Sequence, residues 1–255
     1  MWSLPLLAAT LPLLVGASPT SRQEKSPIFF LAGDSTTKGD GGWGSGFLPT
    51  LKSPAWGLNF AVQGTTTRSF VRGGYWANVT DHTAKYAAKH DIYVTISFGH
   101  NDQKSGSGVN TTQYKANLIE LGTTIKELGG RPLYVTSLSR RVFPADQPHN
   151  TTDSLHDQRL LAIEAAQETD STFIDLNAAS LEYLNQIGAA DAQKFNWGEN
   201  GTTGADRTHL NPLGSIVFGR MVADLVEKAL PGLQPWINEN KTLSYDIWHG
   251  IFPAQ

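Results

Sequence analysis

The chain has no cysteine in 255 residues, so no disulfide can hold it together. Its stability must come from a buried core, and a domain of this size buries about 70% of the surface it exposes when unfolded. The sequence also lacks His-Glu-x-x-His, any Cys/His cluster and a glycine-rich loop ending in Lys-Ser/Thr. These absences argue against a zinc hydrolase and a nucleotide-binding loop, and we expect no metal and no cofactor.

Charge and long apolar runs are also scarce. Only 17% of residues are charged and the formal net charge is −3, which gives no electrostatic footprint for nucleic acid. No segment after the first residues is apolar over the roughly 20 positions that a membrane span needs. With no internal repeat and no linker rich in Pro, Gly or Ser, the sequence predicts one domain over residues 18–255, and we expect a monomer.

The first residues have the pattern of a secretory leader. An apolar stretch runs from Leu4 to Val15 and ends in the small residues Gly16 and Ala17. Five Asn-x-Ser/Thr sequons follow, each a candidate glycosylation site on a surface loop. We therefore predict a signal peptide over residues 1–17, with a short N-terminal anchor as the alternative, and an extracellular glycoprotein. The sequons are at Asn78, Asn110, Asn150, Asn200 and Asn240.

Strand-like and helix-like segments alternate along the chain. The patterns favour strands at 28–32, 58–62, 92–98, 133–137 and 173–176, and helices at 114–128, 157–169 and 212–229. In the last of these helices, Asn211 suits the N-cap and Pro212 the first helical position. This alternation predicts a central parallel sheet covered by helices on both faces, a three-layer α/β/α sandwich.

Polar and glycine-bearing turns follow the first three predicted strands, and a fourth precedes the last helix. Ligands of open α/β sheets bind beyond the carboxyl ends of the strands, so these four turns should meet at one edge. The serine of the first turn then has two interpretations, as a nucleophile or as part of a helix cap. The turns read Gly33-Asp34-Ser35-Thr36, Gln63-Gly64-Thr65-Thr66, Gly99-His100-Asn101-Asp102 and Asp206-Arg207-Thr208-His209.

In this order the four turns resemble the blocks of the GDSL, or SGNH, hydrolase superfamily, over most of the chain. Phe-Gly-His-Asn-Asp at 98–102 and the segment Arg68-Ser69-Phe70-x-Arg72 resemble its rhamnogalacturonan acetylesterase branch, although Thr-Thr after Gly64 departs from it. The resemblance implies a flavodoxin-like SGNH fold and a secreted esterase that removes acetyl groups from pectin. Its alternatives are an acetylxylan esterase, a lipase or esterase on other acyl groups, and a carbohydrate-binding protein without catalysis.

The residue types suit acyl transfer. Ser35 needs a neighbouring base to become a nucleophile, and His209 is the proposed base, oriented by Asp206. The superfamily pattern implies that the N–H groups of Ser35 and Gly64 and the side-chain amide of Asn101 bind the oxyanion. Gly-x-Ser-x-Gly, the nucleophile motif of another hydrolase fold, does not occur.

The spacing Asp-x-x-His does not by itself identify the base, because it occurs three times. The other pairs are Asp146/His149 and Asp153/His156, in a long loop after the fourth strand. We favour Asp206/His209 because it directly precedes the capped last helix.

Substrate contacts are expected near the same blocks. Asp34, Arg68, His100 and Trp197 are the candidates, with His100 equally suited to a structural hydrogen bond. Trp43, Trp76 and Trp197 can stack on sugars, although each is more typical of a core or rim aromatic. The glycines at 39–46 are interpreted as a flexible turn around Trp43.

Overall fold

The strand β1 (Pro27–Gly33) is buried at every residue and lies inside a five-stranded sheet. The computed structural model describes residues 25–253, so the predicted signal peptide lies outside the described residues. All neighbouring strands of the sheet pair in parallel. Their order across the sheet is β2 (Trp56–Asn59), β1, β3 (Asp91–Ser97), β4 (Arg131–Val135) and β5 (Thr172–Ile174). The α/β fold class predicted from the sequence is confirmed.

The strand order places the site. The chain runs from β1 outward to β2 and returns past β1 to β3, so β1 and β3 flank the topological switch point, where ligands of such sheets bind. Gly33 at the end of β1 pairs in register with Ser97 at the end of β3. The amide of Val62 donates to the carbonyl of Gly33 at 3.0 Å. The turns that follow β1, β2 and β3 therefore start side by side.

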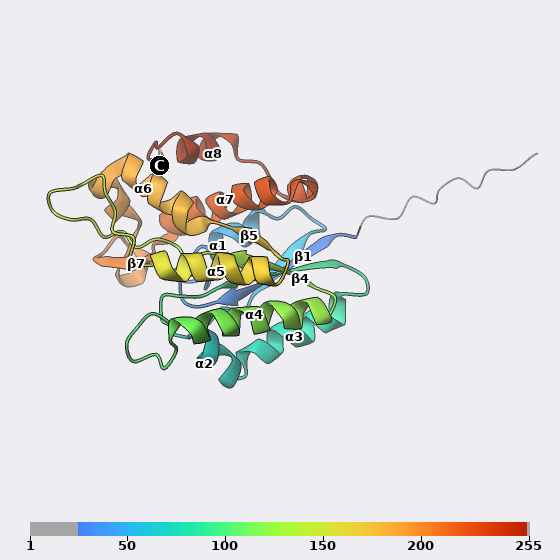
Figure 1. Ribbon diagram of the computed structural model, residues 1–255. Coiled ribbons are helices and arrows are strands. Elements are labelled where there is room, and N and C mark those ends of the chain that lie inside the picture. The colour runs from blue at the N-terminus through green and yellow to red at the C-terminus, as the bar shows by residue number, and fades with distance from the viewer. Residues whose placement is uncertain (1–24, 254–255) are drawn as a thin grey trace, which may run out of the picture.

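Helices cover both faces of the sheet (Figure 1). Alternate residues of β1 point to opposite faces. Ile28 and Phe30 pack in one apolar cluster with the helices that lie between residues 67 and 168. Phe29 and Leu31 pack in the other cluster with the helices that lie between residues 176 and 248. The result is the predicted three-layer sandwich.

The elements have the following bounds. The sheet strands after β1 are β2 (Trp56–Asn59), β3 (Asp91–Ser97), β4 (Arg131–Val135) and β5 (Thr172–Ile174). A small antiparallel pair consists of β6 (Asn196–Trp197) and β7 (Asp206–Leu210). The helices are α1 (Gly44–Phe47), α2 (Thr67–Arg72), α3 (Tyr75–Tyr86), α4 (Thr111–Glu127), α5 (His156–Glu168), α6 (Leu176–Ala192), α7 (Pro212–Ala229) and α8 (Lys241–Trp248). Short 3-10 turns lie at Leu48–Thr50, Gln193–Phe195, Glu199–Gly201 and Pro231–Trp236.

The predicted elements are found with shifted ends. The last helix begins as expected, because Asn211 Oδ1 accepts from the amide of Gly214 at 2.9 Å and Pro212 is the first helical residue. The second strand was predicted at 58–62, which starts too late, because β2 begins at Trp56. This strand lies at the edge of the sheet and has mixed burial. Leu176, expected in a strand, starts α6, whose N-cap is Asp175. No helix among residues 25–253 has the length and apolar character needed to cross a membrane.

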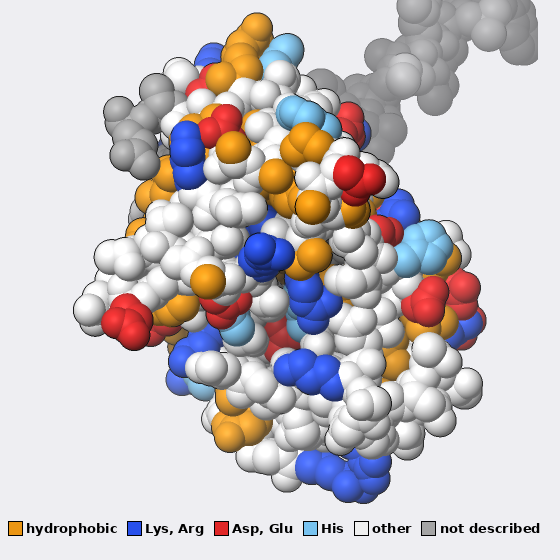
Figure 2. Space-filling view, turned by 90° about the vertical axis from the view of Figure 1, so that its left-hand side faces the viewer, with side chains coloured by type: hydrophobic (Ala, Val, Ile, Leu, Met, Phe, Trp, Pro, Cys, Tyr) orange, Lys and Arg blue, Asp and Glu red, His pale blue; other side chains and the backbone are white. Residues whose placement is uncertain are grey.

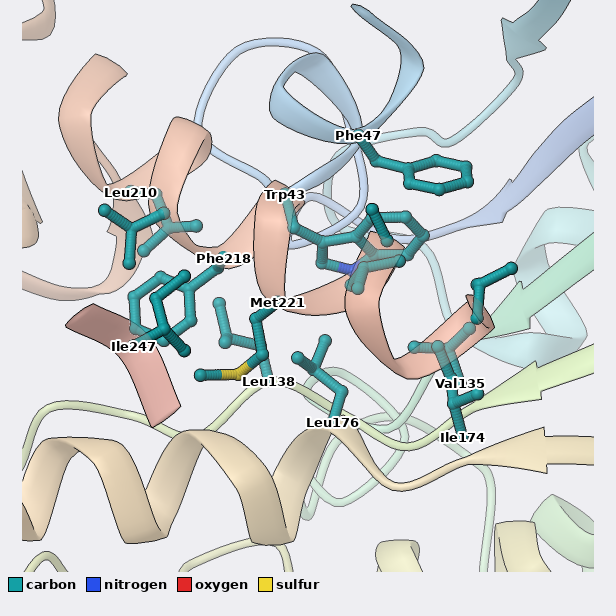
Figure 3. Close-up of a cluster of buried hydrophobic side chains, with 14 of the residues drawn as sticks. Trp43, Phe47, Val135, Leu138, Ile174, Leu176, Leu210, Phe218, Met221 and Ile247 are labelled. Atoms are coloured by element: carbon teal, nitrogen blue, oxygen red, sulfur yellow. The ribbon is translucent and has the colours of Figure 1, made fainter. Parts of the chain in front are cut away.

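The glycines around Trp43 form a turn and the short helix α1, and three of them, Gly42, Gly44 and Gly46, are closely packed. A Cβ on Gly46 would lie 1.8 Å from the carbonyl oxygen of Ser215 on α7, which only glycine avoids. Trp43 is completely buried and lies beside Phe47 in the core cluster (Figure 3). Trp76 is also buried, so neither of these tryptophans is available for sugar stacking.

Candidate active site

Ser35 lies in the turn that leaves β1 at the switch point, with 7% of its surface exposed. Asp34 shapes this turn: its Oδ1 accepts from the amide of Thr36 at 2.9 Å and from the Thr36 hydroxyl at 2.8 Å. The amides of Thr37 and Lys38 both donate to the Asp34 carbonyl. The serine is therefore held by a local hydrogen-bonded turn at the edge where ligands of open α/β sheets usually bind.

A continuous hydrogen-bonded chain joins Ser35, His209 and Asp206. His209 Nε2 lies 2.8 Å from Ser35 Oγ, and His209 Nδ1 lies 2.6 Å from Asp206 Oδ2. A carboxylate only accepts, so Nδ1 carries the proton and the unprotonated Nε2 can accept one from the serine hydroxyl. The arrangement is the one in which an imidazole activates a serine.

The carboxylate of Asp206 is held by its own turn. Its Oδ1 accepts from the amides of Thr208 at 2.8 Å and His209 at 3.0 Å. Burial raises the pKa of Asp206, but the hydrogen bonds from the His209 ring and from these amides outweigh it, and the pKa lies below its usual value. Asp206 therefore stays ionised in mild acid.

The turn that contains Gly41 packs against the side chain of His209. The Gly41 carbonyl accepts from the amide of Leu210 at 2.8 Å. A Cβ at Gly41 would lie 3.4 Å from Cβ of His209, and the φ of +94° is one that side-chain-bearing residues rarely adopt. Glycine here lets the turn before α1 approach the histidine closely.

The other two Asp-x-x-His pairs lie elsewhere. His149 Nδ1 lies 2.8 Å from the Asn185 carbonyl, and its ring packs against Gly188 of α6. His156 is exposed and lies 3.3 Å from Asp153. Of the three pairs that share this spacing, the structure brings Asp206/His209 to Ser35.

Gly64 and Asn101 lie on the turns that start beside that of Ser35. Gly64 is exposed with a φ of +77°, and a Cβ there would meet open space, so its backbone conformation is what favours glycine. Asn101 is buried; its Nδ2 donates to the Thr65 carbonyl at 3.0 Å and its Oδ1 accepts from Lys104 Nζ at 2.7 Å. These bonds fix the amide, whose nitrogen still carries a second N–H.

Two of the expected substrate contacts, Asp34 and His100, are buried and make structural hydrogen bonds, so their role as substrate contacts stays a prediction. Asp34 has no exposed surface because its side chain turns inward to hold Thr36. Burial raises its pKa to about 6, opposed by the Thr36 hydrogen bonds and aided by the charge of Asp102. His100 is 3% exposed, and its Nε2 lies 2.8 Å from the Leu138 carbonyl. Burial and the charge of Arg140 lower the His100 pKa to about 3, so the ring is a neutral structural donor.

The other two expected contacts line surface hollows. Arg68 donates from Nη1 to the Gly108 carbonyl at 3.0 Å and borders a hollow of ≈450 Å³ between α2 and Ser107. Trp197 is half-buried and borders a hollow of ≈420 Å³ that also contains Gly41, the residue against His209. Both side chains therefore lie at open hollows of the surface.

Several site residues were not predicted from the sequence. Asp102 holds α2 by accepting from the amide and the hydroxyl of Thr67 at 2.9 and 2.6 Å. Arg140 is half-buried and donates to Ser154 Oγ at 2.9 Å. Arg141 is completely buried and bonded to the turn of Asp206 and His209. An Arg-Arg pair in a loop is typical of exposed cations, so the local sequence held no signal for Arg141.

A parallel sheet with a carboxylate–imidazole–hydroxyl chain at its carboxyl edge defines an α/β protein of the hydrolase type. The chain belongs to the GDSL-like lipase/acylhydrolase family, whose model matches residues 31–215. This confirms the resemblance carried by the four turns.

Similar proteins agree with this membership. Rhamnogalacturonan acetylesterase RhgT of Bacillus subtilis is 29% identical over 80% of this chain and 91% of its own length. Probable rhamnogalacturonan acetylesterase YesY of the same species is 27% identical, over 82% of this chain and 97% of its own. The fold matches that of a catalytic mutant of Axe2, an acetylxylan esterase from Geobacillus stearothermophilus. That match has a TM-score of 0.58 and 19% identity, and covers 81% of this chain and 94% of the other.

Proposed function

We propose that this chain is a secreted serine esterase that removes O-acetyl groups from rhamnogalacturonan. The observation that carries catalysis is the 2.8 Å contact between Ser35 Oγ and His209 Nε2, with Asp206 on the far side of the ring. The curated relatives named as rhamnogalacturonan acetylesterases support the carbohydrate substrate.

The first half-reaction transfers the acetyl group to the enzyme. Ser35 Oγ attacks the ester carbonyl while its proton moves to His209 Nε2, and Asp206 stabilises the imidazolium. The negative charge moves to the carbonyl oxygen, for which the N–H groups of Ser35, Gly64 and Asn101 are the proposed donors. Such donors are worth about 10²–10³ in rate each. The intermediate then expels the sugar oxygen, which takes the proton from His209.

The second half-reaction releases acetate. Water attacks the acetyl carbonyl on Ser35, and His209 accepts the water proton. The second tetrahedral intermediate collapses, the bond to Ser35 Oγ breaks, and His209 returns the proton to that oxygen. The products are acetate and the starting enzyme, so the cycle needs no redox partner.

Unpaired cations around the site favour a substrate that carries carboxylates. Figure 2 shows the side of the molecule that lies at the left of Figure 1. Lys and Arg side chains surround the middle of this side, where histidine and acidic side chains are also visible. Arg68, Arg72, Lys104, Arg140 and Arg207 lie on the site's turns or next to them, and among the described residues none of the five has a carboxylate within 4.0 Å. Free cations attract a polyuronate electrostatically, whereas they add little to the binding of a neutral polymer. This supports pectin over xylan.

Secretion and glycosylation are part of the proposal. All five sequon asparagines are exposed, which attachment of a glycan requires. Asn78 lies on α3 rather than on a loop, and Asn110 and Asn240 cap helices through Oδ1, which leaves Nδ2 free for the sugar. A mass shift of the secreted protein after treatment with an N-glycosidase tests this part.

Acetate release from a polysaccharide panel tests the substrate. We expect faster release from acetylated rhamnogalacturonan than from acetylated xylan, and a decline from acetyl to long-chain nitrophenyl esters. Preference for long chains would instead support the lipase or general esterase alternative, and preference for xylan the acetylxylan esterase. Binding of the glycan without any turnover would support a non-catalytic protein.

A further inference from the structure

Arg141 ties the histidine turn to the rest of the domain. Its guanidinium Nη2 donates to the carbonyl of His209 at 2.5 Å and to that of Asp206 at 3.4 Å. Its backbone N–H donates to the carbonyl of Arg207 at 2.9 Å. Three of the four carbonyls between positions 206 and 209 thus accept a hydrogen bond from this residue.

The Arg141 side chain is also held by a hydrogen bond at Nε. Nε donates to Asn196 Oδ1 at 2.7 Å, and Asn196 pairs with Leu210 in the β6–β7 ladder. Arg141 itself lies in the loop that leads from β4 to α5. The residue therefore bridges the loop after the main sheet and the hairpin that carries Asp206 and His209.

Stability alone does not account for a charge at this position. Arg141 is completely buried, and among the described residues no carboxylate lies within 4.0 Å of it. Burial lowers its pKa to about 9, and the more distant charge of Asp206 only partly opposes this. Replacing buried charges by apolar residues of similar volume is often neutral or stabilising, so a buried cation without a counter-ion points to another use.

We propose that Arg141 is a positioning residue for the proposed esterase reaction, acting through the turn of Asp206 and His209. By binding the carbonyls of this turn, it holds the amides of Thr208 and His209 on Asp206 Oδ1 and the imidazole in line with Ser35. A misplacement of about 1 Å at such a site costs about 10²-fold in rate. The inference rests on the proposed function, because it assigns a role within that reaction.

The test is p-nitrophenyl acetate kinetics on the full chain with Arg141→Gln and Arg141→Lys. We expect kcat of Arg141→Gln to fall by about 10- to 100-fold with KM within about twofold, since the turn of Asp206 and His209 shifts while the turns of Ser35, Gly64 and Asn101 remain. Arg141→Lys keeps the charge and one of the donor nitrogens, and it should recover part of the loss. The rate at which a fluorophosphonate labels Ser35 should fall in parallel.

Arg220→Lys is the matched control. Arg220 is also buried and charged, but it pairs with Asp224 at 2.7 Å and donates to the Asn238 carbonyl, away from the histidine turn. We expect this variant to lose thermal stability and to keep kcat per folded molecule. It separates a general loss of packing from an effect on the reaction.

A double-mutant cycle with Asp206→Asn shows whether Arg141 acts through the turn. If it does, Arg141→Gln costs much less labelling rate in the Asp206→Asn background than in wild type. Full additivity, or a kcat within threefold of wild type for folded Arg141→Gln, would overturn the proposal. If Arg141→Gln does not fold, unchanged kcat in Arg141→Lys together with additivity for that variant overturns it instead. If the wild-type enzyme hydrolyses no ester, the proposed function itself is refuted. This result differs from the outcomes that refute only the role of Arg141.

Discussion

His209 Nε2 lies 2.8 Å from Ser35 Oγ, although 174 positions separate the two residues in the chain. The contact places an unprotonated nitrogen against the hydroxyl that is to be activated. Ser35→Ala should therefore abolish acetate release, with kcat lower by about 10⁶. Ser171→Ala, next to the start of β5 at the opposite edge of the sheet, is the control. A Ser35→Ala enzyme with most of its activity would refute the esterase assignment.

The Asp206 carboxylate holds the ring of His209 in the tautomer that leaves Nε2 free. Asp206→Asn replaces this acceptor with an amide and should lower kcat by about 10⁴ while KM changes little. Asp153→Asn is the control, because Asp153 has the same spacing to a histidine in an exposed pair. Equal losses in both variants, measured with p-nitrophenyl acetate, would contradict the choice of base.

Asp34 should make folding stability depend on pH. Its pKa rises from 3.8 to about 6 on folding, so between these values the folded state binds more protons than the unfolded chain and stability falls as pH rises. Relative to Asp34→Asn, whose side chain does not titrate, wild type should lose about 2 kcal/mol of unfolding free energy between pH 4 and pH 7.5.

Denaturant unfolding at both pH values measures this difference. The intrinsic cost of the amide cancels, since only the change with pH is compared. Asp40→Asn, at an exposed aspartate in the next turn, is the control. If the difference in unfolding free energy between wild type and Asp34→Asn does not change from pH 4 to pH 7.5, burial does not raise the pKa of Asp34.

Arg68 and Arg72 should matter for a charged polymer and not for a small ester. The double variant Arg68→Ala/Arg72→Ala is expected to raise KM for acetylated rhamnogalacturonan several-fold and to weaken its dependence on salt, because screened charges are lost. Turnover of p-nitrophenyl acetate should stay within twofold. The control Lys228→Ala/Lys241→Ala removes two cations from α7 and α8. Equal effects of both pairs would argue against a specific uronate contact.

Trp197 is expected to support the polymer beside His209. Trp197→Ala should raise KM for the polysaccharide several-fold, because the aromatic face on which a sugar ring would stack is lost. Small-ester kinetics should hardly change. Trp248→Ala, which removes an exposed tryptophan on α8, provides the comparison. A polymer KM that is unaltered in Trp197→Ala would place the sugar chain elsewhere.

Local patterns in the sequence were enough to predict much of the architecture. The apolar run of β1, the alternation of strands and helices, and the cap at Asn211 each depend on neighbouring residues, so they can be interpreted without the fold. The order of the four turns was sufficient to identify the family, which the family model confirms. The position of Asp206 and His209 directly before the capped last helix ranked them above two pairs of identical spacing.

Tertiary structure decided what depends on contacts distant in sequence. The burial of Asp34 and His100, the packing of Gly41 against His209, and the bonds from Arg141 to the 206–209 turn all join separate segments. Residue type does not settle these, because an arginine or aspartate in a loop is usually solvated. The sequence by itself determined which residues are chemically suited to a hydrolase. The folded chain alone determined which of them meet, since hydrogen bonds require distances near 3 Å that only packing sets.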